Sequence, residues 1–225
     1  MMARILIQVI KRILAVFGLG IYRIRSTVNQ TQDHEIHPIY YNSKEGMNEF
    51  YANPNNLVVL DGPEQSAFYR EVIAVLRTTG VDGNNLRIAD IGCGTGHLLL
   101  HLRDSFDSSS LTGFDFSEEA LRIARTVVPE AKLIRAEISE LVSIENRFDI
   151  VCCTEVLEHV LFAELALRNI LSIVGMRGIA IVTVPDGRID TYGGHINFWS
   201  PESWRVFVER FGADFEIDTG SLEMG

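Results

Sequence analysis

Apolar and polar residues alternate in blocks from about residue 61 onward. Short apolar runs, typical of buried strands, are followed by longer segments with helical spacing. This alternation predicts an α/β fold, a doubly wound and mostly parallel sheet of Rossmann-like class. The predicted strands are LRIADIG (86–92), LTGFDF (111–116), AKLIRAEI (131–138), FDIVCCTEV (148–156), GIAIVTVP (178–185) and ADFEIDTG (213–220).

Capping residues mark the ends of the predicted helices. Ser117 and Ser200 can cap two of them, and Pro63 and Pro201 stand in first turns, where proline removes no helical hydrogen bond. Gly175 follows a longer apolar segment and indicates its end. The predicted helices are 61–80, 97–106, 117–128, 157–174 and 200–212.

The N-terminal part differs from the main domain, which we place at residues 57–225. Residues 1–28 predict a basic amphipathic helix, because Lys11 and Arg12 interrupt the apolar run and disfavour a membrane span or a secretory signal. Such a helix suits an anionic membrane surface, or it packs on its own domain or on a partner subunit. Residues 29–56 are polar and punctuated by Asn, Pro and Gly, which indicates a connector or lid.

Charge and cysteine content narrow the class of protein. The formal net charge is −10, and an acidic body repels a polyanion, so extended nucleic-acid binding is disfavoured. Cys93, Cys152 and Cys153 lack the spacing of a disulfide scaffold, and we expect them to be small buried side chains in a reducing compartment. We therefore expect a cytoplasmic protein, with peripheral membrane contact through residues 1–28 as one alternative.

The stretch DIGCGTG (90–96) places three glycines at alternate positions between the first predicted strand and its helix. Glycines there allow positive φ and close approach of a ligand to backbone N–H groups. A dinucleotide turn needs its third glycine where His97 stands, so a nicotinamide-dependent dehydrogenase is disfavoured. The motif D-x-G-x-G-x-G instead resembles the S-adenosylmethionine site of class I methyltransferases.

Over roughly residues 57–221 the chain is similar to the ubiquinone-biosynthesis O-methyltransferase-like group, types 11 and 12. The core of that family has seven strands, whereas the pattern here ends after a sixth, so we expect the last strand to be missing or supplied differently. The resemblance implies S-adenosylmethionine as cofactor, with Asp115 accepting hydrogen bonds from both ribose hydroxyls and Phe116 on the adenine face. The implied cofactor-binding residues are Asp90, Gly92, Cys93, Gly94, Gly96, Asp115, Phe116, Glu137, Ile138 and Thr154.

Two further features bear on the methyl acceptor. Glu155, Glu158 and His159 share one face of a predicted helix start, and His195 follows the fifth strand at the same rim of the sheet. Together they could hold Mg²⁺ or Mn²⁺, a pattern that resembles small-RNA 3′-terminal 2′-O-methyltransferases. Alternatively, His159 or His195 acts as a metal-free base, or Glu158 and His159 only cap and orient the helix. The aromatic residues Tyr192, Phe198 and Trp199 either line an acceptor pocket or belong to the core.

The leading hypothesis is a methyltransferase that acts on a hydroxyl of a small or lipid-linked molecule. The basic N-terminus suits a lipid-linked acceptor, and the acidic body argues against RNA. Two alternatives stay open: metal-assisted 2′-O-methylation of RNA 3′ ends, and a non-catalytic binding module that keeps the methyltransferase fold.

Overall fold

The computed structural model describes residues 42–60, 62–81, 85–107, 109–145, 147–212 and 215–222. All of them belong to the second of two compact units, residues 36–225. The N-terminal helix predicted at residues 1–28 lies outside the described residues. No helix in the described ranges is long and apolar enough to cross a membrane.

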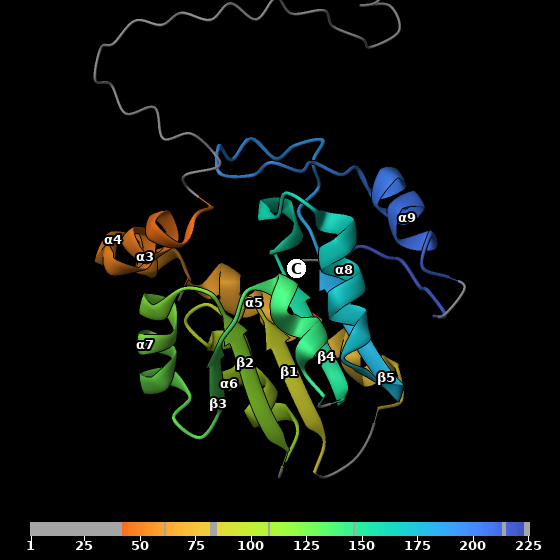
Figure 1. The fold of residues 1–225 in the computed structure, drawn as a ribbon, viewed down its shortest axis with the longest axis horizontal. Coiled ribbons are helices and arrows are strands. Elements are labelled where there is room, and N and C mark those ends of the chain that lie inside the picture. The colour runs from red at the N-terminus through yellow and green to blue at the C-terminus, as the bar shows by residue number, and fades with distance from the viewer. Residues whose placement is uncertain are drawn as a thin grey trace, which may run out of the picture. The chain divides into compact units, whose positions relative to one another are not determined.

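The described residues form a five-stranded parallel sheet in the order β3-β2-β1-β4-β5 (Figure 1). Five of the six predicted strands are thereby confirmed. Asp90 pairs with Gly113 on one side and Cys152 on the other, so the carboxyl ends of the central strands lie at one rim. The strands are β1 (Arg87–Ile91), β2 (Ser110–Asp115), β3 (Lys132–Arg135), β4 (Phe148–Thr154) and β5 (Val174–Thr183).

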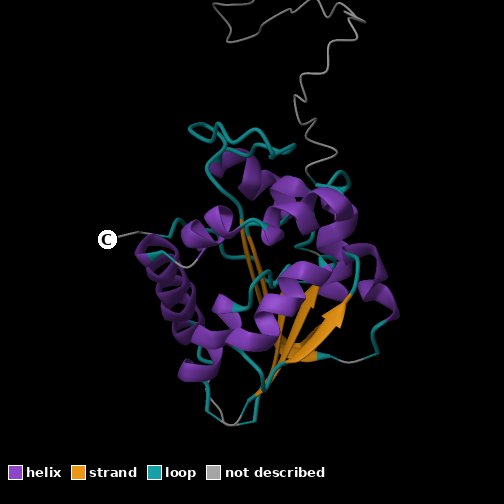
Figure 2. Cartoon of the chain, turned by 90° about the vertical axis from the view of Figure 1, so that its left-hand side faces the viewer, coloured by secondary structure: helices purple, strands orange, loops and turns teal. Residues whose placement is uncertain are grey.

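Helices cover both faces of this sheet, as Figure 2 shows. Alternate strand residues face opposite sides, so Ile88 and Ile150 join one apolar cluster while Ala89 and Val151 join the other. Both clusters are buried, as the near-continuous apolar strands predict. The first is covered by α5 (Pro63–Thr78), α6 (His97–Ser105) and α7 (Glu118–Val127), the second by the 3₁₀ turn η1 (Ile138–Ser143), α8 (Ala163–Ser172) and α9 (Pro201–Glu209).

Several local predictions are confirmed. The Ser117 side chain accepts a hydrogen bond from the Ala120 amide, and Ser200 accepts one from Ser203, so both cap their helices. All three cysteines are buried and free. Burial raises the pKa of each thiol well above its usual value, so they are inert apolar side chains.

The single helix predicted at residues 157–174 is wrong. A 3₁₀ turn η2 (Leu157–His159) comes first, α8 begins only at Ala163, and Val174 already belongs to β5. Tertiary hydrogen bonds replace the helical ones here, because the Asn197 side chain donates to the carbonyls of Leu157 and Val160.

The predicted sixth strand is also wrong for the residues that are described. Residues 215–222 pair with no strand. Ile217 packs against one apolar cluster and Leu222 against the other, so this segment gives its apolar side chains to both faces of the sheet rather than to one. Asp218 and Gly220, residues that disfavour strands, lie between them.

The described part of the predicted connector, residues 42–56, is mostly helical. It forms α3 (Lys44–Ala52) and the start of α4 (Pro54–Leu60). Helix α3 packs against α7. This places the segment beside the carboxyl rim of the sheet, where ligands bind in folds of this type.

Candidate functional site

A cavity of about 870 Å³ lies at the carboxyl rim of the sheet, between the glycine turn, α3 and the loop after β4. A volume of this order accommodates a cofactor-sized molecule. Nearly all predicted site residues line it, namely Asp90, Gly92, Cys93, Gly94, Asp115, Phe116, Glu137, Ile138, Thr154, Glu155, Glu158, His159 and His195.

Gly94 forms the middle of the glycine turn and faces the cavity. Its φ is +50°, and a Cβ there would lie 3.0 Å from the Tyr51 hydroxyl of α3. Its amide donates to Asp115 Oδ2 at 2.9 Å. The backbone is therefore bare at the point where a ligand would approach it.

Gly96 was predicted to bind the cofactor, but it does not line the cavity. Its φ is +84°, and a Cβ would lie 3.1 Å from both Ala124 Cβ and Val128 Cγ1, on and just after α7. Close packing of α6 against α7 therefore explains this glycine. One motif thus holds two glycines with different roles.

Asp115 ends β2 with its carboxylate held by backbone amides. Oδ2 accepts from Gly94, and Oδ1 accepts from Ser117 at 2.8 Å. Each oxygen keeps a lone pair that can accept from a ligand hydroxyl. Burial raises the pKa of Asp115, and burial together with the charge of Asp115 raises the pKa of neighbouring Asp90 to about 8.

Glu137 was predicted beside the adenine, but its carboxylate has a local partner. Glu137 and Glu140 form a reciprocal capping box at η1, in which the Glu137 amide donates to Glu140 Oε2 at 2.8 Å. Phe116 and Ile138 provide apolar surface at the same end of the cavity. The cofactor contact of Glu137 stays a prediction.

Helix α3 adds contacts that sequence reasoning missed. Asn48 Oδ1 accepts from the Ser117 hydroxyl at 2.7 Å and from the Glu119 amide at 3.3 Å. Met47 and Tyr51 line the cavity. No motif marks these residues, because a polar segment before the first strand carries no sign of where it folds back.

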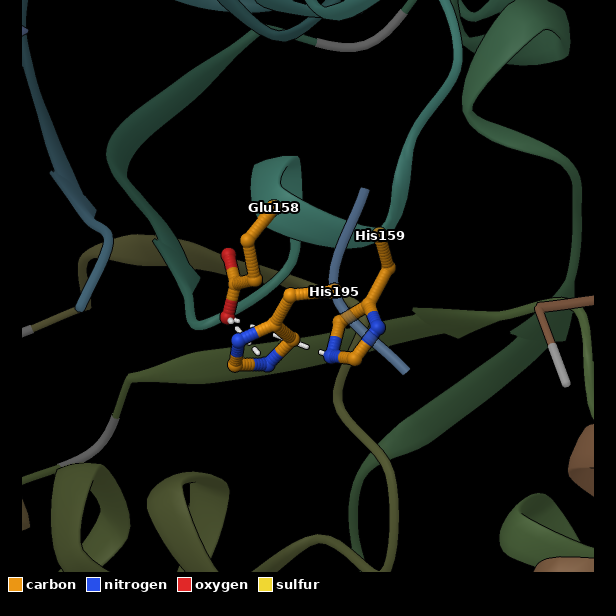
Figure 3. A group of neighbouring side chains, drawn as sticks. All are labelled: Glu158, His159 and His195. Atoms are coloured by element: carbon orange, nitrogen blue, oxygen red, sulfur yellow. Dashed lines mark ion pairs between the residues drawn. The ribbon is translucent and has the colours of Figure 1, made fainter. Parts of the chain in front are cut away.

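Glu158, His159 and His195 converge at the other end of the cavity, and we call them the histidine–glutamate cluster (Figure 3). One ligand atom from each lies within 4.8 Å of the others. The Nε2 atoms of His159 and His195 lie 4.0 and 3.9 Å from Glu158 Oε1. In the described part of the chain, neither buried oxygen of Glu158 has a hydrogen-bond partner. An orphaned buried carboxylate facing two imidazoles suits a bound cation.

Burial sets the protonation of this cluster. It raises the pKa of Glu158 to about 9, with a further contribution from the charge of Glu155. It lowers the pKa of His159 to about 4, with a contribution from His195. Burial thus disfavours a charge on Glu158 and on His159 alike.

The predicted ligand Glu155 lies outside the cluster. Thr183 Oγ1 donates to Glu155 Oε1 at 2.9 Å, and the Glu155 amide donates to the Thr183 carbonyl at 3.2 Å. Its φ of +55° is uncommon for a non-glycine residue and turns the chain away from β4. The structure thus brings together three of the four predicted ligands.

The loop after β5 docks onto η2 and carries His195 into place. The amides of Ile196 and Asn197 both donate to the Glu158 carbonyl, at 2.9 and 3.0 Å. The Asn197 side chain donates to Leu157 O at 2.9 Å and to Val160 O at 2.7 Å. Asn197 therefore holds the loop after β5 against η2, a role that no sequence motif identified.

Two more residues missed from sequence contact the histidines. Asn42 Oδ1 lies 2.8 Å from His159 Nδ1, and Asp190 Oδ2 lies 2.5 Å from His195 Nδ1. Both stand in polar segments, where their positions relative to a histidine depend on loop conformation alone.

The predicted aromatic wall divides into two parts. The ring centroids of Tyr192 and Phe198 lie 4.9 and 6.3 Å from that of His195. Trp199 instead packs with Trp204 and Phe207 at centroid distances of 5.3 and 5.4 Å. Tyr192 borders the cavity, whereas Trp199 belongs to an aromatic cluster that supports α9.

A second hollow of about 560 Å³ adjoins the cavity, since Leu161 lines both. Its lining combines the apolar side chains of Phe162, Leu165, Trp199 and Phe207 with the polar ones of Glu164, Arg168 and Asn197. Leu161, Phe162 and Leu165 are 62%, 73% and 53% exposed. Three exposed apolar side chains thus follow Glu158 and His159 of the histidine–glutamate cluster along the chain and line the second hollow.

A family model described as a methyltransferase domain matches residues 64–216, more than half of the chain. The chain belongs to the class I S-adenosylmethionine-dependent methyltransferases. A ubiquinone biosynthesis O-methyltransferase of Azorhizobium caulinodans is 27% identical over 72% of this methyltransferase and 70% of the relative. A trans-aconitate 2-methyltransferase of Enterobacter is 28% identical over 44% of the chain and 39% of the relative. These relatives differ in acceptor, so they leave the acceptor of this methyltransferase open.

Solved structures support the same fold. The plantazolicin methyltransferase BpumL, solved with S-adenosylhomocysteine, has a TM-score of 0.60 at 15% identity, covering 78% of this chain and 77% of that one. A TehB-like methyltransferase from Corynebacterium glutamicum has a TM-score of 0.56 at 22% identity, covering 74% and 83%. At such identities the likeness shows the fold alone.

The cavity fits S-adenosylmethionine as the cofactor of this methyltransferase. Gly94 keeps the turn free of side chains, and Asp115 directs two partly used carboxylate oxygens at the cavity. Phe116 and Ile138 supply apolar surface for a base. These residues would hold the nucleoside, which leaves the end with Thr154 and Glu155 for the methionine part.

Proposed function

We propose that this methyltransferase transfers the methyl group to a hydroxyl of a small or lipid-linked acceptor. The observation that carries the proposal is that the histidine–glutamate cluster and the glycine turn line one cavity. A methyl donor and an acceptor held at these two ends would therefore meet inside it.

The chain's part in this reaction is to orient the reactants and accept a proton. Bound S-adenosylmethionine supplies a methyl group on a sulfonium, already activated for in-line displacement by the acceptor oxygen. The acceptor hydroxyl would lose its proton in this transfer, so the chain has to supply a group that takes it. Nε2 of His159 or His195 is placed to take it, because both face the cavity with Nδ1 engaged elsewhere.

We further propose that Glu158, His159 and His195 hold Mg²⁺ or Mn²⁺. The support is the unpartnered carboxylate of Glu158 facing two imidazole nitrogens. A divalent cation there would supply acidification of the acceptor hydroxyl. The alternative is a metal-free base, which the 2.5 Å hydrogen bond between Asp190 and His195 favours, since a carboxylate on Nδ1 fixes the ring and leaves Nε2 to accept a proton.

A lipid-linked acceptor is favoured by the exposed apolar side chains that line the second hollow beside the cluster. Leu161 joins the cavity to the second hollow, where Phe162 and Leu165 are exposed. An apolar chain attached to the reactive hydroxyl would cover these side chains. Phe162→Ser and Leu165→Ser should raise the KM for a long-chain acceptor about tenfold and leave that of its short-chain analogue unchanged. Equal effects on both acceptors would contradict the subsite.

Calorimetric titration tests the cofactor and the cation separately. S-adenosylmethionine, S-adenosylhomocysteine and Mn²⁺ would each be titrated into the wild type, Asp115→Ala and Glu158→Gln. We expect loss of cofactor binding in the first variant only and loss of Mn²⁺ binding in the second only. A folded wild type that binds no cofactor would overturn the enzyme assignment. Cofactor binding without any Mn²⁺ binding would leave the metal-free base.

Two further experiments test the acceptor class and the contact with membranes. Methylation of such RNA in preference to hydroxylated lipids would overturn the acceptor proposal, which the net charge of −10 supports. We retain peripheral membrane contact of residues 1–28 in a cytoplasmic protein as a proposal. Liposome co-sedimentation that is equal with and without these residues would end it.

A further inference from the structure

Both histidines of the cluster use the same ring nitrogen for an outside partner. His159 Nδ1 contacts Asn42 Oδ1 at 2.8 Å, and His195 Nδ1 contacts Asp190 Oδ2 at 2.5 Å. The two partners stand far apart in the sequence, Asn42 before α3 and Asp190 after β5. In each ring Nε2 is thereby left facing Glu158. The same arrangement occurring twice at one site needs an explanation.

The contacts of Asn42 fix the tautomer of His159. Asn42 Nδ2 donates to the Gly194 carbonyl at 2.7 Å, and a carbonyl can only accept. The amide oxygen must therefore be the atom that faces His159. Because that oxygen can only accept, Nδ1 carries the hydrogen and Nε2 of the neutral ring keeps its lone pair.

The contacts of Asp190 have the same consequence for His195. Asp190 Oδ1 accepts from the Tyr192 amide at 2.9 Å, which holds the carboxylate in the loop. Its Oδ2 accepts from Nδ1 of His195. A carboxylate that accepts in this way leaves Nε2 of the neutral ring as an acceptor.

We propose that Asn42 and Asp190 are positioning residues that hold both cluster histidines in the Nδ1–H tautomer, so that two Nε2 lone pairs and the Glu158 carboxylate converge on one point. Partners of this kind orient metal-binding or basic imidazoles from behind. The proposal rests on the proposed function for what is recognised at that point, a divalent cation or an acceptor hydroxyl. The tautomers themselves do not depend on it.

Asn42 also stands at the start of the segment that borders the cofactor end. It immediately precedes Ser43, the N-cap of α3, and Asn48 of that helix accepts from Ser117. A change at Asn42 can therefore reach the cofactor end, whereas Asp190 hydrogen-bonds to Tyr192 of its own loop and to His195. The two variants should thus differ in their effect on cofactor affinity.

The test is long-range ¹H–¹⁵N NMR of the imidazole nitrogens in the ligand-free protein, with His159 and His195 assigned by His→Gln substitution. Both rings should show a protonated Nδ1 and an unprotonated Nε2. Asp190→Asn can donate to Nδ1 instead, and should shift His195 toward the Nε2–H tautomer. Asn42→Ala should release His159 to a mixture of both tautomers. Asp186→Asn, in the same loop but paired with Arg188, is the control and should change neither ring.

The second readout is the affinity for Mn²⁺. Asp190→Asn should weaken it at least tenfold and Asp190→Glu less, with S-adenosylhomocysteine affinity unchanged in both. Asn42→Ala should weaken Mn²⁺ binding and also cofactor binding. Wild-type rings in the Nε2–H tautomer, or variants with unaltered tautomers, would overturn the positioning roles. Correct tautomers in a wild type that binds no Mn²⁺ would uphold them and reject only the metal.

Discussion

The cofactor end and the acceptor end of the cavity are held together by different kinds of hydrogen bond. At the cofactor end, backbone amides of a short stretch meet one carboxylate, as Gly94 and Asp115 do over a separation of 21 residues. At the acceptor end, side chains join distant loops, as Asn42 and His159 do over 117 residues. The contact between Gly94 and Asp115 thus joins two short segments that follow neighbouring strands, whereas the cluster histidines depend on several loops at once.

The largest expected effect is a difference between Gly94 and Gly96, two glycines of the turn at residues 90–96. Gly94→Ala would place a methyl group 3.0 Å from the Tyr51 hydroxyl inside the cavity, whereas Gly96→Ala would press on Ala124 and Val128. Alanine at positive φ costs about 1–2 kcal/mol in either case. Gly94→Ala should lower S-adenosylmethionine affinity about a hundredfold, since the methyl group also disturbs the amide that holds Asp115.

Gly96→Ala should instead lower the free energy of unfolding by roughly 2–4 kcal/mol, the backbone cost plus overpacking. Calorimetry and urea unfolding on both variants separate the two effects. Reversed results would mean that the glycine facing the cavity is the structural one.

A second pair compares two asparagines that tie loops down. Asn197→Ala removes the side-chain donor from the carbonyls of Leu157 and Val160, of which Leu157 O keeps the Val160 amide at 3.2 Å. Asn169 donates to the Ile138 carbonyl at 3.2 Å, near the cofactor end. Each change should cost about 1–3 kcal/mol of stability. Hydrogen exchange at residues 157–160 should rise only in Asn197→Ala, and S-adenosylhomocysteine should bind more weakly only in Asn169→Ala. Identical behaviour of the two variants would argue that the two ends form one unit.

The same contrast explains what could be predicted from the sequence. Five strands, the caps at Ser117 and Ser200 and the place of Asp115 follow from apolar patterning and short motifs, which act over a few residues. The cluster histidines could be named because both follow strands that end at one rim. Their tautomers could not, since these depend on Asn42 and Asp190.

The predictions that differ from the structure differ because of contacts between distant parts of the chain. The break before α8 arises because Asn197, far along the chain, takes the carbonyls that a continuous helix would use. The helical α3 was predicted only as a connector or lid, since its polar residues gain partners such as Ser117 only in the folded state. Local propensity cannot encode contacts of this kind.

The smallest expected effect is the part of the pH dependence that Asp90 contributes at the cofactor end. Burial, with the charge of Asp115, raises the pKa of Asp90 to about 8, far above that of an aspartate in the unfolded chain. Between these pKa values the native state holds a proton that the unfolded chain has released, so stability is highest at low pH and falls as the pH rises toward 8. The loss near neutrality should be about 1 kcal/mol per pH unit. Asp90→Asn cannot ionise at this position. It should therefore remove the Asp90 contribution to the pH dependence of the free energy of unfolding, measured with urea between pH 6 and 8. The control Asp149→Asn, at an exposed carboxylate paired with Arg87, should keep it. An equal pH dependence of the free energy of unfolding in the wild type and Asp90→Asn would mean that Asp90 is already ionised at neutral pH. Asp90 and Asp115 would then both carry a negative charge.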